Sequence, residues 1–355
     1  ALRTGGAGLW LWPNALHAID ALGQSVGRAV RGAGIVQTSN RVRDARGRTL
    51  VRVAVARADG QLYRSLSIRR AALLAALAAA LPPDAIRFGA AVTGVDVGDA
   101  NAGATVHLAD GTAWEADLVV AADGVGSAIR AALFGDSGRR DAGFTAFRAV
   151  VPFPGAANVD GGVVWGRGCR FGVLAVAEDC MNWFAGFTAP ANLEPADRLA
   201  VIRARFAGWP DPVCALLDAT GPGDVRADRL EYCTPPPAWS LGRVALLGDA
   251  AHAMTPSLGQ GAGQALEDAV ALGEAVAADP GDIAAALAAY GRRRKRRAAD
   301  VAARSIRMDR LVQIESPLLC AVRNRIVALV PPPLVRRFHR SMWGLPWPDE
   351  VSEEL

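Results

Sequence analysis

The chain has 355 residues, of which 51% are hydrophobic and 21% are charged. This composition argues against a disordered polypeptide, and the length suits about two domains of roughly 150 residues each. The formal net charge of +4 is far smaller than a dedicated nucleic-acid binder needs. Five scattered cysteines without a CxxC pair argue against a disulfide framework or a thiolate zinc site, so a cytoplasmic location is expected.

Membrane, metal and nucleic-acid sites are not expected. The longest apolar run, Ala71 to Leu81, is shorter than the about 20 residues that span a bilayer. The segment Leu334 to Trp347 nevertheless mixes apolar and basic residues and could touch a membrane or a second subunit. Four histidines lack the spacing of metal ligands. The six basic residues of Arg292 to Arg297 circle a helix completely, so they are interpreted as a solvated, partner-facing surface.

The amino-terminal part is typical of an α/β protein. The continuous apolar run Leu118 to Ala122 predicts a strand buried on both faces. Before it we expect, in chain order, a glycine-rich loop and short helix at 5–23, a hairpin at 41–55, a helix at 69–81, and short strands at 85–97 and 103–108 with a turn at 110–111.

The middle of the chain has a different character, and the first pattern returns after it. Four β-rich runs predict a separate antiparallel sheet, at 144–153, 161–166, 169–177 and 181–188. The buried strand Val244 to Leu247 is followed by a long helix from Gly261 to Val276. One face of that helix carries small and apolar residues, namely Ala262, Leu266, Ala269, Val270 and Gly273. Helices dominate from there to the end.

Two segments share one design, a buried strand that ends near an acidic residue and is followed by a glycine-rich turn and a helix. The first contains Asp123 and Gly124, and the second contains Gly248 and Asp249. Ligands of open α/β sheets bind at the carboxyl ends of the strands, where Asp can accept hydrogen bonds from ribose or ribitol hydroxyls. An ordinary strand–helix turn explains either segment alone, but the pair is much more specific for a ligand site.

These segments resemble the single-component, or class A, FAD-dependent aromatic hydroxylases. The similarity is closest to the salicylate and 3-hydroxybenzoate hydroxylases and the zeaxanthin-epoxidase-like enzymes, and it runs over nearly the whole chain. The residues that carry it are Asp123, Gly124, Ser127 and Arg130 for the second flavin motif, Gly248 to His252, Pro256, Gly259 to Gly261 and Glu267 to Ala269 for the third, and Ile68 to Leu73 for the helix with a cofactor-contacting Arg.

The resemblance implies an α/β fold in which a Rossmann-like FAD-binding domain is interrupted by an inserted antiparallel β-sheet substrate domain and followed by a helical carboxyl-terminal part. The expected boundaries are 1–140 for the first part of the FAD-binding domain, which lacks the first βαβ unit, 141–238 for the substrate domain, 239–280 for the second part of the FAD-binding domain and 281–355 for the carboxyl-terminal helices.

The resemblance also implies a monooxygenase, monomeric or homodimeric, that uses FAD, NADH or NADPH, and dioxygen. It would hydroxylate a phenolic or heteroaromatic small molecule through a flavin hydroperoxide. Pro256 and Gln260 are the expected catalytic positions, at the reacting edge of the flavin ring. The expected cofactor-binding residues are Arg70, Asp123, Gly124, Arg130, Gly248, Asp249, Gly259, Gly261 and Ala262. No catalytic base is assigned.

One departure from the family concerns the dinucleotide fingerprint. The chain contains no complete G-x-G-x-x-G, the turn that holds the pyrophosphate in this family. We expect the gene to encode about 35–40 further residues that include this roughly 30-residue unit. Two alternatives stay open, an alkene epoxidase of the same family and a non-catalytic paralogue that has lost FAD.

Overall fold

The computed structural model forms two compact units, each built from separate stretches of the chain. It describes residues 7–37, 39–54, 65–99, 102–135, 138–190 and 193–344. Unit 1 consists of Leu81–Ala142 and Glu231–Arg307, and unit 2 of Leu2–Ala80, Gly143–Leu230 and Met308–Leu355. Residues 2–80 are thus grouped with the middle of the chain, whereas the sequence-based boundaries join them to 81–140. The division into FAD-binding and substrate domains stays a prediction.

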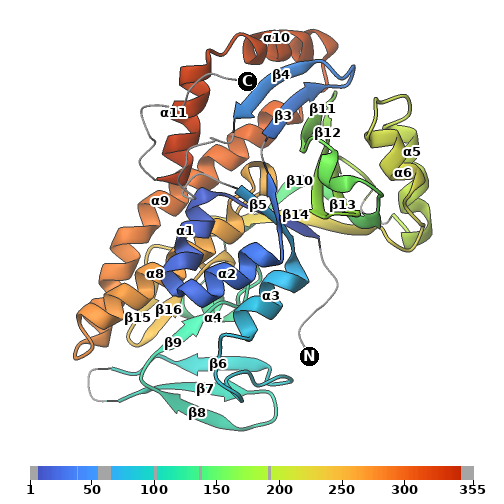
Figure 1. The fold of residues 1–355 in the computed structure, drawn as a ribbon. Coiled ribbons are helices and arrows are strands. Elements are labelled where there is room, and N and C mark those ends of the chain that lie inside the picture. The colour runs from blue at the N-terminus through green and yellow to red at the C-terminus, as the bar shows by residue number, and fades with distance from the viewer. Residues whose placement is uncertain are drawn as a thin grey trace. The chain divides into compact units, whose positions relative to one another are not determined.

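Unit 1 contains two small sheets and the longest helix of the described chain (Figure 1). One sheet has the order β15-β16-β9 and the other the order β6-β7-β8. The elements are β6 (Val92–Asp96), β7 (Ala104–Leu108), β8 (Ala113–Ala116), β9 (Val119–Ala121), α4 (Ala128–Phe134), β15 (Ser240–Leu241), β16 (Val244–Leu246), α7 (Asp249–His252), η4 (Pro256–Leu258), α8 (Gly261–Ala278) and α9 (Ile283–Val312), which ends in unit 2.

The core of unit 1 surrounds β16, whose three residues are completely buried. The Tyr290 hydroxyl of α9 donates to the Leu246 carbonyl at 2.9 Å, and burial raises the pKa of that hydroxyl. The predicted strand at Leu118 to Ala122 is confirmed as β9, but its burial on both faces is wrong. Val120 is 39% exposed while Ala121 is buried, because only one face of this edge strand is packed.

Unit 2 is organised around a seven-stranded sheet with the order β14-β10-β13-β12-β11-β3-β4. The four predicted β-rich runs are confirmed as β10 to β13, which pair antiparallel where they are neighbours. The predicted hairpin is confirmed as β3 and β4, and its turn is held by Asp44, whose Oδ1 accepts the N–H groups of Arg46 and Arg48. The sheet strands are β3 (Ser39–Asp44), β4 (Thr49–Ala54), β10 (Arg139–Pro152), β11 (Gly162–Trp165), β12 (Cys169–Ala177), β13 (Cys180–Phe187) and β14 (Arg226–Cys233).

A second, three-stranded sheet and several helices complete unit 2. The predicted helix at 69–81 is confirmed as α3. Aromatic rings fill the core, where Phe171 stacks on Trp183 at 5.3 Å and meets Phe206 edge-on at 5.2 Å. The remaining elements are β1 (Gly8–Leu11), α1 (Pro13–Leu22), α2 (Gln24–Gly32), β2 (Ile35–Gln37), β5 (Ser65–Arg69), α3 (Arg70–Ala78), η2 (Ala156–Asn158), η3 (Pro195–Asp197), α5 (Arg198–Arg205), α6 (Val213–Asp218), α10 (Pro317–Ala328) and α11 (Pro332–Trp343).

Candidate active site

The two strand–turn–helix segments lie side by side in unit 1. β9 and β16 are parallel, with Ala121 opposite Leu246, so their carboxyl ends lie at the same edge of the sheet. The ladder extends one step further, because the Leu247 N–H donates to the Ala121 carbonyl at 3.0 Å. The Asp123–Gly124 turn and the Gly248–Asp249 turn therefore leave the sheet side by side.

Arg130 ties these two turns to each other. It is 1% exposed, and its guanidinium donates to the carbonyl oxygens of Ala250 at 2.6 Å, of Asp249 at 3.3 Å and of Val125. The N–H of Arg130 is in turn held by the Ser127 hydroxyl at 2.9 Å, which caps α4. Arg130 thus fixes the backbone of both turns, and its predicted contact with the cofactor stays a prediction.

Asp123 and Gly124 form the first turn. The Asp123 side chain is exposed, and its Oδ2 accepts the Ile129 N–H at 3.3 Å, so one of its oxygens helps to begin α4. Gly124 has φ +84°, a conformation that side chains disfavour. No atom lies within 4 Å of the place that a Cβ would occupy there, so the outer side of this turn is open.

Asp249 has a different environment in the second turn. Gly248 before it has φ +61°, and a Cβ there would lie 3.1 Å from the Ala265 Cβ. The Asp249 side chain reaches solvent and makes no hydrogen bond to the part of the chain that the structure describes. The surrounding protein still raises the pKa of its carboxyl by desolvation, which the nearby His252 opposes. Among the described residues, Asp249 therefore has no hydrogen-bond partner for its carboxylate, which lies shortly after the end of β16.

The amino end of α8 lies a few residues further along the chain. Gly259 ends η4 with φ +61°, and α8 begins at Gly261. No atom lies within 4 Å of the place of a Cβ at Gly261, so a ligand can approach the backbone of the first turn, which includes Ala262. The first N–H groups of a helix have no intrahelical acceptors and carry positive dipole character. This end of α8 can stabilise negative charge.

The two expected catalytic positions differ in their exposure. Pro256 begins η4 and is exposed. Gln260 is 1% exposed, and its Oε1 accepts a long hydrogen bond of 3.4 Å from the Gln264 amide. The catalytic roles of both residues stay predictions.

A buried ionic network below the second turn was missed by the sequence analysis. The Asp268 carboxylate of α8 accepts hydrogen bonds from the Gly248 N–H at 3.0 Å, His252 Nε2 at 2.5 Å and Arg294 Nε at 2.7 Å. Although burial opposes its ionisation, His252 and Arg294 lower the pKa of Asp268. The network holds Gly248, and with it Asp249, in place.

Arg294 also corrects the interpretation of the basic run at 292–297. It is buried rather than solvated, and it pairs with Asp268 and with Glu267, whose Oε2 lies 2.6 Å away. Arg297 contacts the same Glu267. The sequence contained a signal for this network, namely the acidic residues of the third flavin motif. Buried carboxylates need partners of opposite charge, and the basic run could supply them.

The packing of α8 follows from this network. The face that carries Ala262, Leu266, Ala269, Val270 and Gly273 is only half-buried or exposed. The completely buried stripe is instead formed by Gly263, Gln264, Asp268, Ala271 and Leu272. Two of its side chains are polar, so hydrophobic periodicity alone could not identify it.

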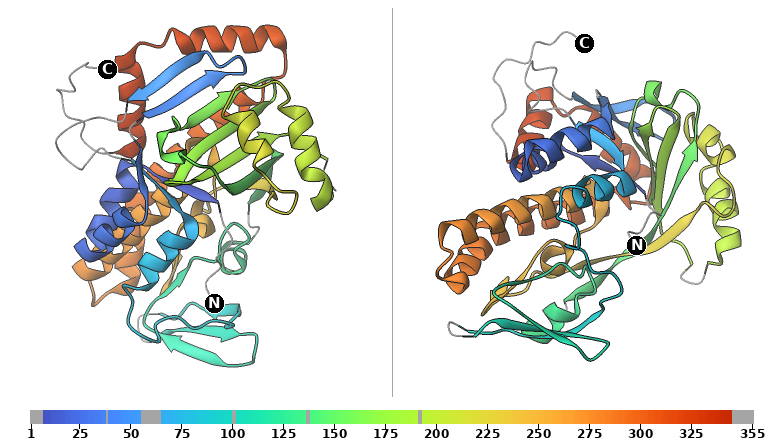
Figure 2. Two further views of the ribbon diagram at one scale, coloured as in Figure 1. Left: turned by 45° about the vertical axis from the view of Figure 1, so that its right-hand side comes forward. Right: turned by 60° about the horizontal axis from the view of Figure 1, so that its bottom comes forward.

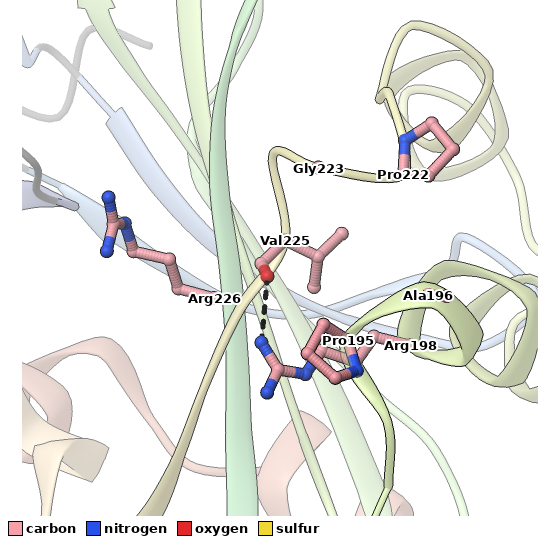
Figure 3. Close-up of a pocket in the computed structure, with 7 residues that line it drawn as sticks. All are labelled: Pro195, Ala196, Arg198, Pro222, Gly223, Val225 and Arg226. Carbon is pink, nitrogen blue, oxygen red and sulfur yellow. Dashed lines mark hydrogen bonds between the residues drawn. The ribbon is translucent and has the colours of Figure 1, made fainter.

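Unit 2 contains the remaining predicted residue and a pocket. Arg70 is exposed at the start of α3, directly after β5. A pocket of about 350 Å³ lies between η3, α5 and the start of β14, where Arg198 donates to the Val225 carbonyl at 3.3 Å (Figure 3). None of the predicted cofactor or catalytic residues lines this pocket, and its lining has no acid, histidine or hydroxyl group that could carry chemistry.

The residues of unit 1 fit a flavin adenine dinucleotide. Asp249 offers to hydroxyl groups a carboxylate that makes no hydrogen bond to the described residues, and the Asp123–Gly124 turn leaves space for a ligand beside its backbone. The amino end of α8 is open at Gly261 and suits the negative charge of a reduced flavin. Among the described residues, no group of three or more His, Cys, Asp or Glu side chains is placed to hold a metal ion.

Comparisons with known proteins identify the family of this chain. Residues 236–305 match the family model described as "FAD binding domain". The chain is 34% identical over 333 residues to the aurachin C monooxygenase/isomerase of Stigmatella aurantiaca, covering 93% of this chain and 86% of that protein. It is 36% identical over 310 residues to the FAD-dependent urate hydroxylase of Mycolicibacterium vanbaalenii, covering 84% and 77%.

A solved structure supports the same conclusion. The Klebsiella pneumoniae protein HpxO, crystallised with FAD and uric acid, is 28% identical, with a TM-score of 0.85 over 95% of this chain and 87% of that one. The chain belongs to the single-component FAD-dependent aromatic hydroxylases. It is an FAD-dependent monooxygenase, and NAD(P)H is the usual electron donor in this family.

Proposed function

We propose that the chain hydroxylates a small phenolic or heteroaromatic compound and that the Gly248–Asp249 turn and the amino end of α8 hold its FAD. The observation that carries the proposal is the Asp249 carboxylate, which lies at the end of a buried strand without a hydrogen bond to the described protein. A carboxylate in this place suits the ribitol hydroxyls of FAD. When bound, FAD supplies the activation of dioxygen that side chains cannot perform.

The chain's own residues have separate tasks in this proposal. Asp249 accepts hydrogen bonds from the ribitol, and Arg130 keeps the two turns at a fixed distance from each other. The first N–H groups of α8 would stabilise negative charge on the bound flavin without reorganisation. Pro256 and Gly259 would lie beside the reacting edge of the flavin ring. The relatives named for urate and aurachin C motivate heteroaromatic compounds as the substrate class.

Two measurements test this function. FAD is titrated into the flavin-free protein, and NAD(P)H oxidation is then followed with a panel of phenols, purines and quinolones. We expect saturable flavin binding and an oxidation rate that rises with one class of aromatic compound, accompanied by a product heavier by one oxygen atom. Flavin binding without any stimulated oxidation or product would contradict the hydroxylase, and an epoxide formed from an alkene would assign the alternative reaction.

A further inference from the structure

The helix α10 turns a charged side chain towards the protein and its apolar side chains outward. It packs against β4, and its inward face carries Cys320 and the buried Arg323. The Arg323 guanidinium donates to the carbonyl oxygens of Leu311 at 3.1 Å and Gly166 at 3.0 Å. Surface helices normally turn their apolar stripe towards the protein and their charges towards water. Here a charge points inward, so the aliphatic side chains are left on the outer face.

The outer face continues from α10 through the following turn into α11. Its members are large apolar side chains with exposures from 36% to 72%, namely Leu318, Leu319, Val322, Ile326, Leu329, Val330, Leu334 and Phe338, and we call them the α10–α11 surface. Three of them recur every fourth residue along α10. In Figure 1 and in the left view of Figure 2, α10 lies along the outer side of the β3–β4 hairpin, and no other described element of unit 2 covers it. A cluster of this size usually marks an interaction site.

The charge of this region indicates the partner. Residues 317–344 contain five arginines and no Asp or Glu. Arg325 and Arg337 are exposed beside the apolar side chains. A second copy that docked through the same surface in a two-fold dimer would bring arginines against arginines. Apolar side chains bordered by arginines instead suit the boundary between anionic headgroups and acyl chains.

We propose that the α10–α11 surface docks on the face of a membrane that contains anionic lipids. The apolar side chains would enter the headgroup boundary, and Arg325 and Arg337 would contact the headgroups. In the described part of the chain, no single helix is long and apolar enough to cross a bilayer; α10 and α11, bent by 93°, meet that test of length and composition only as a pair. Peripheral docking needs no span, so this proposal revises the expectation that the protein makes no membrane contact.

Co-sedimentation of the full chain with vesicles tests the proposal. Phosphatidylcholine vesicles with and without phosphatidylglycerol are compared at low and high salt. We expect binding to the anionic vesicles that is roughly tenfold stronger than to the neutral ones and that weakens with salt. The double variant Leu318→Ser/Ile326→Ser should lose binding to both kinds. Arg325→Ala/Arg337→Ala should lose only the preference for anionic lipid.

A matched control variant and two opposing outcomes make the test decisive. Leu241→Ser removes an aliphatic side chain that is 46% exposed in unit 1, and it should bind like the unaltered protein. Circular dichroism checks that each variant is folded. Absence of vesicle binding, together with a dimer that Leu318→Ser/Ile326→Ser dissociates in sedimentation velocity, would overturn the proposal in favour of a second copy. Binding only by a chain shortened after Gly344 would also overturn it, because the acidic tail would then be the partner.

Discussion

The two turns at the edge of the β15-β16-β9 sheet have the same design but use their carboxylates differently. Asp123 accepts a backbone N–H from α4 and so takes part in the structure of its own turn. In the second turn the comparable task is performed by Asp268, which comes from α8 and accepts the Gly248 N–H. Asp249 is consequently left without a hydrogen bond to the described protein.

The difference shows that a carboxylate in such a turn is available to a ligand only when another residue supports the backbone of the turn. α4 has its own cap in Ser127 and an additional acceptor in Asp123. α7 is only four residues long, and its first residue is Asp249 itself. Because a distant carboxylate supports the second turn, the local one can serve a cofactor. Removing each carboxylate in turn should separate these roles.

The largest effect is expected for Asp268→Ala. This change leaves His252 buried without its carboxylate partner and removes one of the two carboxylates that pair with Arg294. Breaking a buried ion pair costs about 3–5 kcal/mol of folding free energy. The free energy of unfolding is measured with urea. Glu274→Ala is the matched control on the same two helices, because the Glu274–Arg293 pair is exposed at both ends and contributes only about 0–1 kcal/mol. Equal losses in the two variants would contradict the supporting role of Asp268.

The next largest effect is expected for Asp249→Ala, and it should concern FAD rather than folding. Loss of a charge-assisted hydrogen bond costs about 1.5–3 kcal/mol, which corresponds to roughly 10–150-fold weaker FAD binding. Asp249→Asn keeps an acceptor oxygen and should lose less. Flavin titration gives the affinities. A melting temperature that falls equally in the flavin-free and flavin-loaded proteins, at unchanged affinity, would show that Asp249 is structural.

Asp123→Ala should have a smaller effect, and this effect should concern folding rather than FAD binding. It removes one long hydrogen bond from the start of α4, while the Ser127 cap remains, so the loss is about 0.5–1.5 kcal/mol. The melting temperature should therefore fall by a similar amount with and without flavin. If the flavin affinity of Asp123→Ala fell as far as that of Asp249→Ala, both carboxylates would serve the ligand and the contrast between the two turns would be lost.

The sequence predicted the parts of this molecule that depend on local patterns. Most of the strands and helices follow from hydrophobic periodicity and turn residues, although the strand expected at 85–97 begins only at Val92. The sequence did not predict that the β3–β4 hairpin joins the seven-stranded sheet through the β3–β11 pair, because that pairing joins distant segments. For the same reason the inward position of Arg294 and the burial of Gln260 were missed, since their partners lie far along the chain or are polar.

The smallest effect should appear in the pH dependence of the flavin-free protein. Desolvation raises the pKa of Asp249 in the folded state above its ordinary value of 3.8, so the folded protein binds this proton more tightly than the unfolded one. The stability that this group confers is complete below pH 3.8 and is lost as the pH rises through the folded-state pKa. The stability that Asp268 confers changes with pH in the opposite direction, because its lowered pKa confers stability that is lost when the pH falls below 3.8.

Asp249→Asn should thus be slightly more stable than the unaltered protein at pH 7 and lose this advantage near pH 3.8. Urea unfolding at several pH values measures the difference, and an advantage that stayed constant with pH would mean that the Asp249 carboxylate is not desolvated.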